Sequence, residues 1–176
     1  MPIPGSCSAP IDFSIAFSRV LKFTLPLALR PTREYLATGR KGMFELWDVR
    51  SKTAIRQFGD YSGWTDAIAF SPDGQTIASS APDNKIRLWN AQTGAEIRAL
   101  RVLASVKVLV FSPTGAILAS GDDDGNLHLW DLEMFEEVYR SKMYSKKLTA
   151  IAFSADGKMI ATAGGSCQIH VCKFTE

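Results

Sequence analysis

The chain of 176 residues has few of the features that mark specialised classes of protein. It contains only three cysteines, Cys7, Cys167 and Cys172. Their number is odd and their spacing matches no zinc pattern, so neither a disulfide framework nor a zinc site is expected. The simplest interpretation is a protein of a reducing compartment, and we expect it in the cytoplasm.

Charge of one sign and long apolar runs are also lacking. The chain has 20 Lys and Arg against 18 Asp and Glu, a net charge of +2. This is too small to favour nucleic acid or an anionic membrane as partner, because both require a concentrated basic surface. No apolar run approaches the roughly 20 residues that span a bilayer. Prolines at positions 2, 4 and 10 interrupt the region where a secretory signal would have its apolar core.

The sequence does contain an internal repeat of 41 to 42 residues. Trp47, Trp89 and Trp130 are separated by 42 and 41 residues, and each closes a similar string that ends in Leu-Trp-Asp or Leu-Trp-Asn. A fourth copy of this string has Cys172 in the place of tryptophan. The turn string Phe-Ser-Pro-Asp-Gly, at 70–74, recurs with small changes at 111–115 and 153–157. Features that share one period in this way indicate a repeat protein.

Each repeat has the pattern of short β-strands. Apolar and polar residues alternate between turn-forming strings, and no stretch of a dozen residues has a helical period. In the second repeat, strands are predicted at 65–70, 76–80, 85–89 and 96–100. Four strands in a unit of about 41 residues are typical of a β-propeller blade. The predicted fold class is therefore all-β, with blades of four antiparallel strands.

These strings resemble those of the WD-repeat family, and the resemblance extends over roughly 21–174. On this basis residues 21–58 form a degraded first blade, 59–100 the second, 101–141 the third, and 142–176 a partial fourth. Residues 1–20 are interpreted as a leader or a stray outer strand, since 11–17 alternate as a strand does. Four blades imply an open half-ring. The chain is then a fragment of a longer propeller, or a second copy or further blades complete its ring.

The resemblance implies a hydrogen-bonded tetrad in each blade, made of a loop histidine, a serine or threonine, a turn aspartate and the repeat tryptophan. The loop histidine is missing throughout, with Tyr61, Val102 and Tyr144 near its place. The remaining positions are Thr38 and Trp47 in the first repeat; Ser79, Asp83 and Trp89 in the second; Ser120, Asp124 and Trp130 in the third; and Thr162 in the fourth.

The hypotheses that these residues form a catalytic site or a metal site are less well supported than a structural role. A serine nucleophile needs a base within hydrogen-bond reach. The two histidines, His128 and His170, are one repeat apart, in a strand position that Arg87 and Glu45 fill elsewhere. The acidic run at 122–124 lacks the rest of a calcium-binding loop. We expect no enzyme activity, no cofactor and no metal.

The remaining functional surface is formed by the loops, because a rigid scaffold exposes function on its loops. Trp64 is either an exposed anchor for a partner or a side chain packed on the neighbouring blade, and both readings stay open. The other partner-binding candidates are Tyr61, Asp66, Arg40, Lys41, Asp122, Asp123, Lys146 and Lys147. The predicted function is a non-catalytic protein-interaction scaffold. The alternative is a C-terminal or internal propeller of a larger regulatory protein whose enzymatic or nucleotide-binding domain lies elsewhere.

Overall fold

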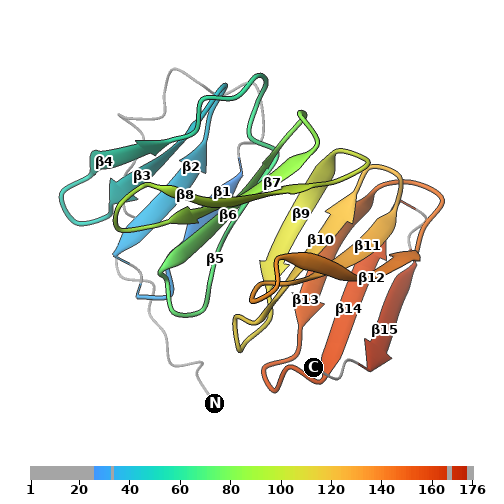
Figure 1. Cartoon of the computed structure of the whole chain (residues 1–176). Coiled ribbons are helices and arrows are strands. Elements are labelled where there is room, and N and C mark those ends of the chain that lie inside the picture. Colours follow the sequence, from blue (N-terminus) through green and yellow to red (C-terminus); the bar gives the residue numbers. More distant parts are fainter. Residues whose placement is uncertain (1–25, 33, 166–167, 174–176) are drawn as a thin grey trace, which may run out of the picture.

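The fold consists of antiparallel sheets joined in series. The computed structural model describes residues 26–32, 34–165 and 168–173. Over these ranges it contains strands β1 to β15 and no helix. The strands form four separate sheets, each of which pairs strands that are consecutive in the chain (Figure 1).

Each sheet corresponds to one repeat. Blade 1 contains Leu27–Leu29 (β1), Tyr35–Gly39 (β2), Phe44–Asp48 (β3) and Thr53–Phe58 (β4). Blade 2 contains Ala67–Phe70 (β5), Thr76–Ala81 (β6), Lys85–Asn90 (β7) and Glu96–Arg101 (β8). Blade 3 contains Val106–Phe111 (β9), Ile117–Asp122 (β10), Asn126–Asp131 (β11) and Glu136–Lys142 (β12). Blade 4 contains Leu148–Phe153 (β13), Met159–Gly164 (β14) and Ile169–Lys173 (β15).

The turn between the first two strands of a blade follows from the Ser-Pro-Asp-Gly string. In blade 2 the Ser71 hydroxyl donates to Asp73 Oδ1 at 2.5 Å, and the Gly74 amide donates to the Ser71 carbonyl at 2.8 Å. Gly74 has φ 69°, a conformation that glycine adopts without steric cost. Gly115 and Gly157 make the equivalent amide bonds, so the same tight turn recurs in blades 3 and 4.

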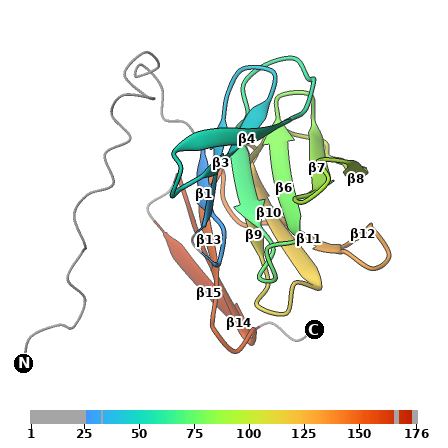
Figure 2. The same cartoon turned by 90° about the vertical axis from the view of Figure 1, so that its left-hand side faces the viewer.

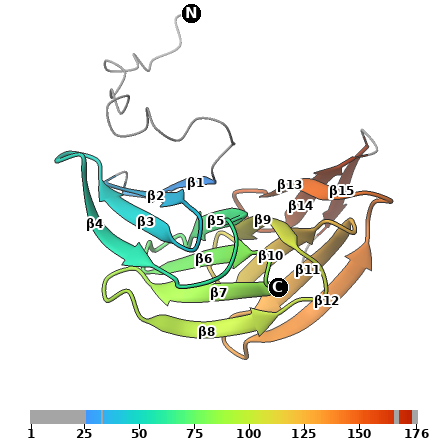
Figure 3. The same cartoon turned by 90° about the horizontal axis from the view of Figure 1, so that it is seen from above.

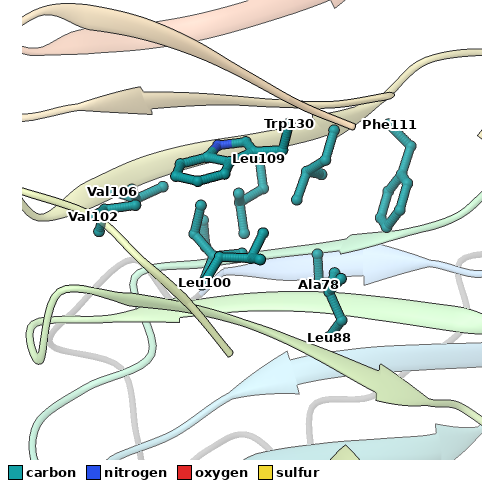
Figure 4. Packing of buried hydrophobic residues seen from close by; sticks show 11 residues of the cluster. Ala78, Leu88, Leu100, Val102, Val106, Leu109, Phe111 and Trp130 are labelled. Carbon is teal, nitrogen blue, oxygen red and sulfur yellow. The ribbon is translucent and has the colours of Figure 1, made fainter. Parts of the chain in front are cut away.

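The hydrophobic core lies between the blades. Because successive side chains of a strand point to opposite faces, the middle strands of blades 2 and 3 each contribute to two core groups. Ile77 packs with blade 1, whereas its neighbour Ala78 packs with blade 3. In the group between blades 2 and 3, Trp130 lies against Leu100 and Leu109 (Figure 4). A third group joins blades 3 and 4.

The four blades follow one another around an arc, with blade 1 at one end and blade 4 at the other (Figure 3). Figure 2 shows the structure turned by 90°, a view in which the blades partly overlap. The all-β fold with antiparallel blades is confirmed. Strands β8 and β12 end at Arg101 and Lys142, one residue beyond the predicted ends of the second and third blades. The leader or stray strand predicted for residues 1–20 lies outside the described residues.

Candidate functional site

Loops at one end of the strands form a continuous surface, which we call the loop rim and define as residues 40–43, 59–66, 102–105, 122–125 and 143–147. Backbone hydrogen bonds join these loops across blade boundaries. The Gly42 amide donates to the Gly63 carbonyl at 2.7 Å, whereas the Asp123 amide donates to the Ser105 carbonyl at 2.9 Å within blade 3. The Tyr144 amide donates to the Gly125 carbonyl at 3.1 Å. The rim is therefore held in one shape by the blades beneath it.

A charged group lies where the rim crosses from blade 2 to blade 3. Lys107 on β9 places its Nζ 3.0 Å from Asp66 Oδ2 and 3.6 Å from Asp123 Oδ2. The Ser105 hydroxyl also donates to Asp66, at 3.1 Å. The Asp123 side chain is 45% exposed. The rim thus presents an acidic group to solvent that a single lysine partly neutralises.

A tryptophan and basic side chains lie where the rim crosses from blade 1 to blade 2. Trp64 is 39% exposed, and its backbone forms an isolated β-bridge with Lys41. Arg40 and Lys41 are exposed, and the Arg40 guanidinium lies 2.9 Å from Glu45. Lys146 and Lys147 are exposed in the loop that leads into blade 4.

Two predicted rim residues, Tyr61 and Asp122, are buried and make hydrogen bonds within the chain. Tyr61 is 8% exposed, and its hydroxyl lies 2.6 Å from Thr65 Oγ1. Its ring faces the Arg87 guanidinium at 5.0 Å. Burial raises the pKa of Tyr61 above its usual value. Asp122 is 1% exposed and binds inside blade 3.

Asp122 accepts the hydrogen bonds of a buried polar network, which was not predicted from the positions of residues in the repeat. It accepts hydrogen bonds from the backbone and side-chain amides of Asn126, both at 2.8 Å. Nε2 of the buried His128 lies 3.0 Å from Asp122 Oδ2, and its Nδ1 lies 2.6 Å from Glu137 Oε1. Asp124, the aspartate predicted for the tetrad, is exposed, and its neighbour Asp122 makes these internal bonds.

The repeat tryptophans are bound within their own blades. Trp89 Nε1 donates to the Ser79 hydroxyl at 2.9 Å, and Trp130 Nε1 to Ser120 at 2.9 Å. In blade 1, Trp47 Nε1 donates to Thr38 at 3.1 Å.

The other positions near the tetrad also make internal bonds. Asp83 binds Arg87, at 2.5 Å. In blade 4 the Tyr144 hydroxyl donates to the Thr162 carbonyl at 2.6 Å. Tyr144 thus occupies the place expected for a loop histidine and ties the rim to the middle strand.

The polar side chains at the repeat positions bond to one another within the blades. The hydroxyls of Ser79 and Ser120 accept from tryptophans, and His128 is enclosed by carboxylates. The part of the chain that the structure describes has no group of three or more His, Cys, Asp or Glu side chains placed to hold a metal ion. It also has no helix with the length and apolar character needed to cross a membrane.

The network in blade 3 predicts loss of stability in acid. A hydrogen bond from Arg140 lowers the pKa of Glu137. Burial alone raises the pKa of Asp122, but bonds from Asn126 and His128 outweigh it and leave that pKa low. Carboxylates that are more acidic when folded stabilise the protein above their unfolded pKa, about 4, and this stabilisation disappears as the pH falls through the folded values. Denaturant titrations should give a free energy of unfolding that falls below about pH 5.

The control for this experiment is Glu137→Gln, which removes one titrating group from the network. Its free energy of unfolding should be lower than that of the parent near neutral pH, and it should fall less steeply in acid. An identical acid slope in the parent and the variant would contradict the assignment.

Comparison with known proteins assigns the chain to a family whose fold matches these blades. Blades 1 to 3 are four-stranded and antiparallel, and each has a tryptophan–hydroxyl bond, which is the pattern of a WD-repeat propeller. The family model described as WD domain, G-beta repeat matches residues 53–90, 97–131 and 137–172. The chain therefore belongs to the WD40 family.

Individual relatives match shorter stretches. The "Periodic tryptophan protein 2 homolog" of Dictyostelium discoideum is 39% identical over 69 residues, 38% of this chain and 8% of that protein. "Nuclear distribution protein PAC1" of Arthroderma otae is 35% identical over 78 residues, 43% of this chain and 17% of that protein. "Pre-mRNA-processing factor 19 homolog 2" of Arabidopsis thaliana is 32% identical over 87 residues, 49% of this chain and 16% of that protein. The matches thus span less than a fifth of each of these relatives.

Proposed function

We propose that the chain is a non-catalytic scaffold that binds other proteins through the loop rim, and that it does so in the cytoplasm. The observation that carries this proposal is the rim itself, in which exposed Trp64 and Asp123 lie on loops held in one shape by hydrogen bonds between blades. A large aromatic side chain on a rigid surface is a favoured anchor for a protein partner, because little entropy is lost on binding. Lys41 and Asp123 would then orient the partner by charge.

The test is affinity purification from cells, with the proteins that are recovered identified and quantified by mass spectrometry. The rim variant is Trp64→Ala combined with Asp123→Lys. Loss of an anchoring tryptophan typically costs at least about 2 kcal/mol, or roughly 30-fold in affinity. We therefore expect the rim variant to lose partners that the parent retains.

The matched control is Met134→Ala combined with Glu133→Lys. These residues are exposed in the turn between β11 and β12, at the other end of β11 from the rim loop 122–125. This control should recover the same partners as the parent. If both variants recover those partners equally, the rim is not the binding surface.

A second proposal concerns the setting of the chain. The matched stretches amount to less than a fifth of the relatives' length. This favours a C-terminal or internal propeller segment of a larger regulatory protein, with further blades in the same polypeptide or a second copy completing the ring. Sequencing of the full transcript decides whether further repeats belong to the same polypeptide.

A further inference from the structure

A second candidate binding site lies between blades 1 and 2, at the end of the strands opposite the loop rim. It is a cleft of about 410 Å³, which we call the arginine cleft. Arg30, at the end of β1, and Arg56 on β4 line one side. Phe70 at the end of β5 and Gln75 in the turn that follows line the other, and Ile55 on β4 adds a half-exposed apolar side chain.

The repeat provides an internal comparison for this cleft. The corresponding space between blades 2 and 3 has a volume of about 220 Å³, roughly half as large. It is lined at repeat-equivalent positions by Phe111 in place of Phe70 and by Ile97 in place of Ile55. The two spaces are therefore the same architectural site, and the difference between them lies in a few substitutions.

The main difference is one residue in the turn after the third strand. Phe135 and Gly94 occupy equivalent places in this turn, with φ 57° and 81°. The Phe135 ring lines the smaller space, and the Arg98 guanidinium lies over it at 5.1 Å. In the arginine cleft Gly94 offers no ring, and Arg56, the equivalent of Arg98, donates instead to the Thr93 carbonyl at 2.9 Å. The cleft is open because the ring that fills its counterpart is absent.

The second difference is charge. Arg30 stands where blade 2 has Ser71, which binds Asp73 within its own turn. The Arg30 side chain instead extends over the Tyr35 ring, at 5.2 Å. Its Nε is buried and has no hydrogen-bond partner among the described residues. An unsatisfied buried donor is costly, and a shift of the Arg30 side chain toward a carboxylate bound in the cleft would remove that cost.

The electrostatic environment favours an anion. None of the described residues that line the cleft is acidic, whereas two are arginines. The nearby Asp73 interacts electrostatically with Arg30, but its carboxylate is occupied by the Ser71 hydroxyl and the Gln75 amide. Arginine pairs with carboxylates through several parallel hydrogen bonds, so both guanidinium groups suit an acidic side chain.

We propose that the arginine cleft binds a peptide segment of a partner protein in which an Asp or Glu stands next to an apolar residue. The carboxylate accepts hydrogen bonds from Arg30 and Arg56. The adjacent apolar side chain covers Ile55 and Phe70, which distinguishes a peptide from a small inorganic anion. This inference rests on the proposed scaffold function and adds a second surface with a stated ligand chemistry.

The test is selection of a phage-displayed library of random heptapeptides on the 176-residue chain, followed by fluorescence polarisation with the peptides that are enriched. Two variants address the cleft. Arg30→Ala removes the unsatisfied donor. Gly94→Phe places a ring where the next blade has Phe135. At Gly94 φ is 81° and a Cβ would lie 2.8 Å from Arg56 Cδ, so the Arg56 side chain must shift, and the melting temperature of this variant is measured alongside its binding. The matched control is Arg98→Ala, which removes the equivalent arginine at the other space.

We expect enrichment of peptides that pair an acidic residue with an apolar one. Their affinity should fall at least about tenfold in Arg30→Ala and in Gly94→Phe, because a hydrogen bond to a charged group is lost or the cleft is filled. Arg98→Ala should bind like the parent. Enrichment of sequences without acidic residues, unchanged binding to Gly94→Phe, or no enrichment at all would overturn the inference. If protein partners are lost in the rim variant but retained in Gly94→Phe, the proposed scaffold function is supported and the proposed arginine-cleft site is contradicted.

Discussion

Replacing Trp89 with alanine is expected to lower the free energy of unfolding by about 3–5 kcal/mol, the usual cost of removing a buried large aromatic side chain. For a chain of this length that corresponds to a drop of roughly 6–20 °C in melting temperature. Trp89 is 6% exposed, and its ring meets Phe44 and Phe58 of blade 1 edge to face at 6.0 and 6.1 Å. The lost stability therefore includes packing between blades 1 and 2. Calorimetry or denaturant titration measures the change in the free energy of unfolding.

Two further variants separate the causes of this effect. Trp64→Ala removes the same side chain from a half-exposed position and should cost less than about 1 kcal/mol. Trp89→Phe keeps most of the packing but loses the hydrogen bond to Ser79, so its cost should be intermediate. If Trp64→Ala and Trp89→Ala are equally destabilised, blade 2 does not pack on blade 1 as described.

The second large effect is expected for Asp122→Ala. Removal of one partner from a buried ionic network typically costs about 3–5 kcal/mol, because the remaining polar groups stay buried without a partner. Here the variant would leave His128 Nε2 and the Asn126 side chain without their acceptor. Denaturant titration near neutral pH measures the loss.

The neighbouring aspartate is the natural control. Asp123 is exposed and lies 3.6 Å from Lys107, so Asp123→Ala should cost no more than about 1 kcal/mol. Equal stability of the two alanine variants would show that the polar network in blade 3 does not contribute to stability.

Much of the fold could be predicted because the repeat leaves a direct imprint on the sequence. The third strand of blade 2 was predicted at 85–89 and extends from Lys85 to Asn90. Alternating residues and Ser-Pro-Asp-Gly turns determine such strands locally. The first strand of blade 2 begins at Ala67, later than the predicted start at residue 65. Thr65 is engaged with the neighbouring loop, where its amide and hydroxyl donate to the Arg40 carbonyl, each at 3.1 Å.

The polar network of blade 3 was beyond sequence reasoning for a different reason. The position of His128 is filled by Glu45 and Arg87 in other repeats, which indicates a general structural slot. Its partners, Asp122 at the end of β10 and Glu137 on β12, become neighbours only through the register of β10, β11 and β12. Because residues 122–124 are all aspartates, the sequence does not indicate which of the three carboxylates points inward.

The arginine cleft did leave a signal in the sequence. Gly94 and Phe135 stand at the same distance behind Asn90 and Asp131 in successive repeats. The consequence of that difference depends on what faces the turn from the neighbouring blade. Arg56 faces Gly94 and Arg98 faces Phe135 from the preceding blade, so the effect of the difference cannot be read from one repeat alone.

The position of the core between blades means that the repeat seen in the sequence is not the unit that folds. Every core group takes its members from two successive repeats. A single repeat expressed alone would keep its hydrogen-bonded ladder but expose both apolar faces to water, and stability in such arrays comes largely from nearest-neighbour contacts. A boundary drawn between repeats would therefore divide a cooperative element. Truncations of this chain should be planned so that they preserve pairs of blades.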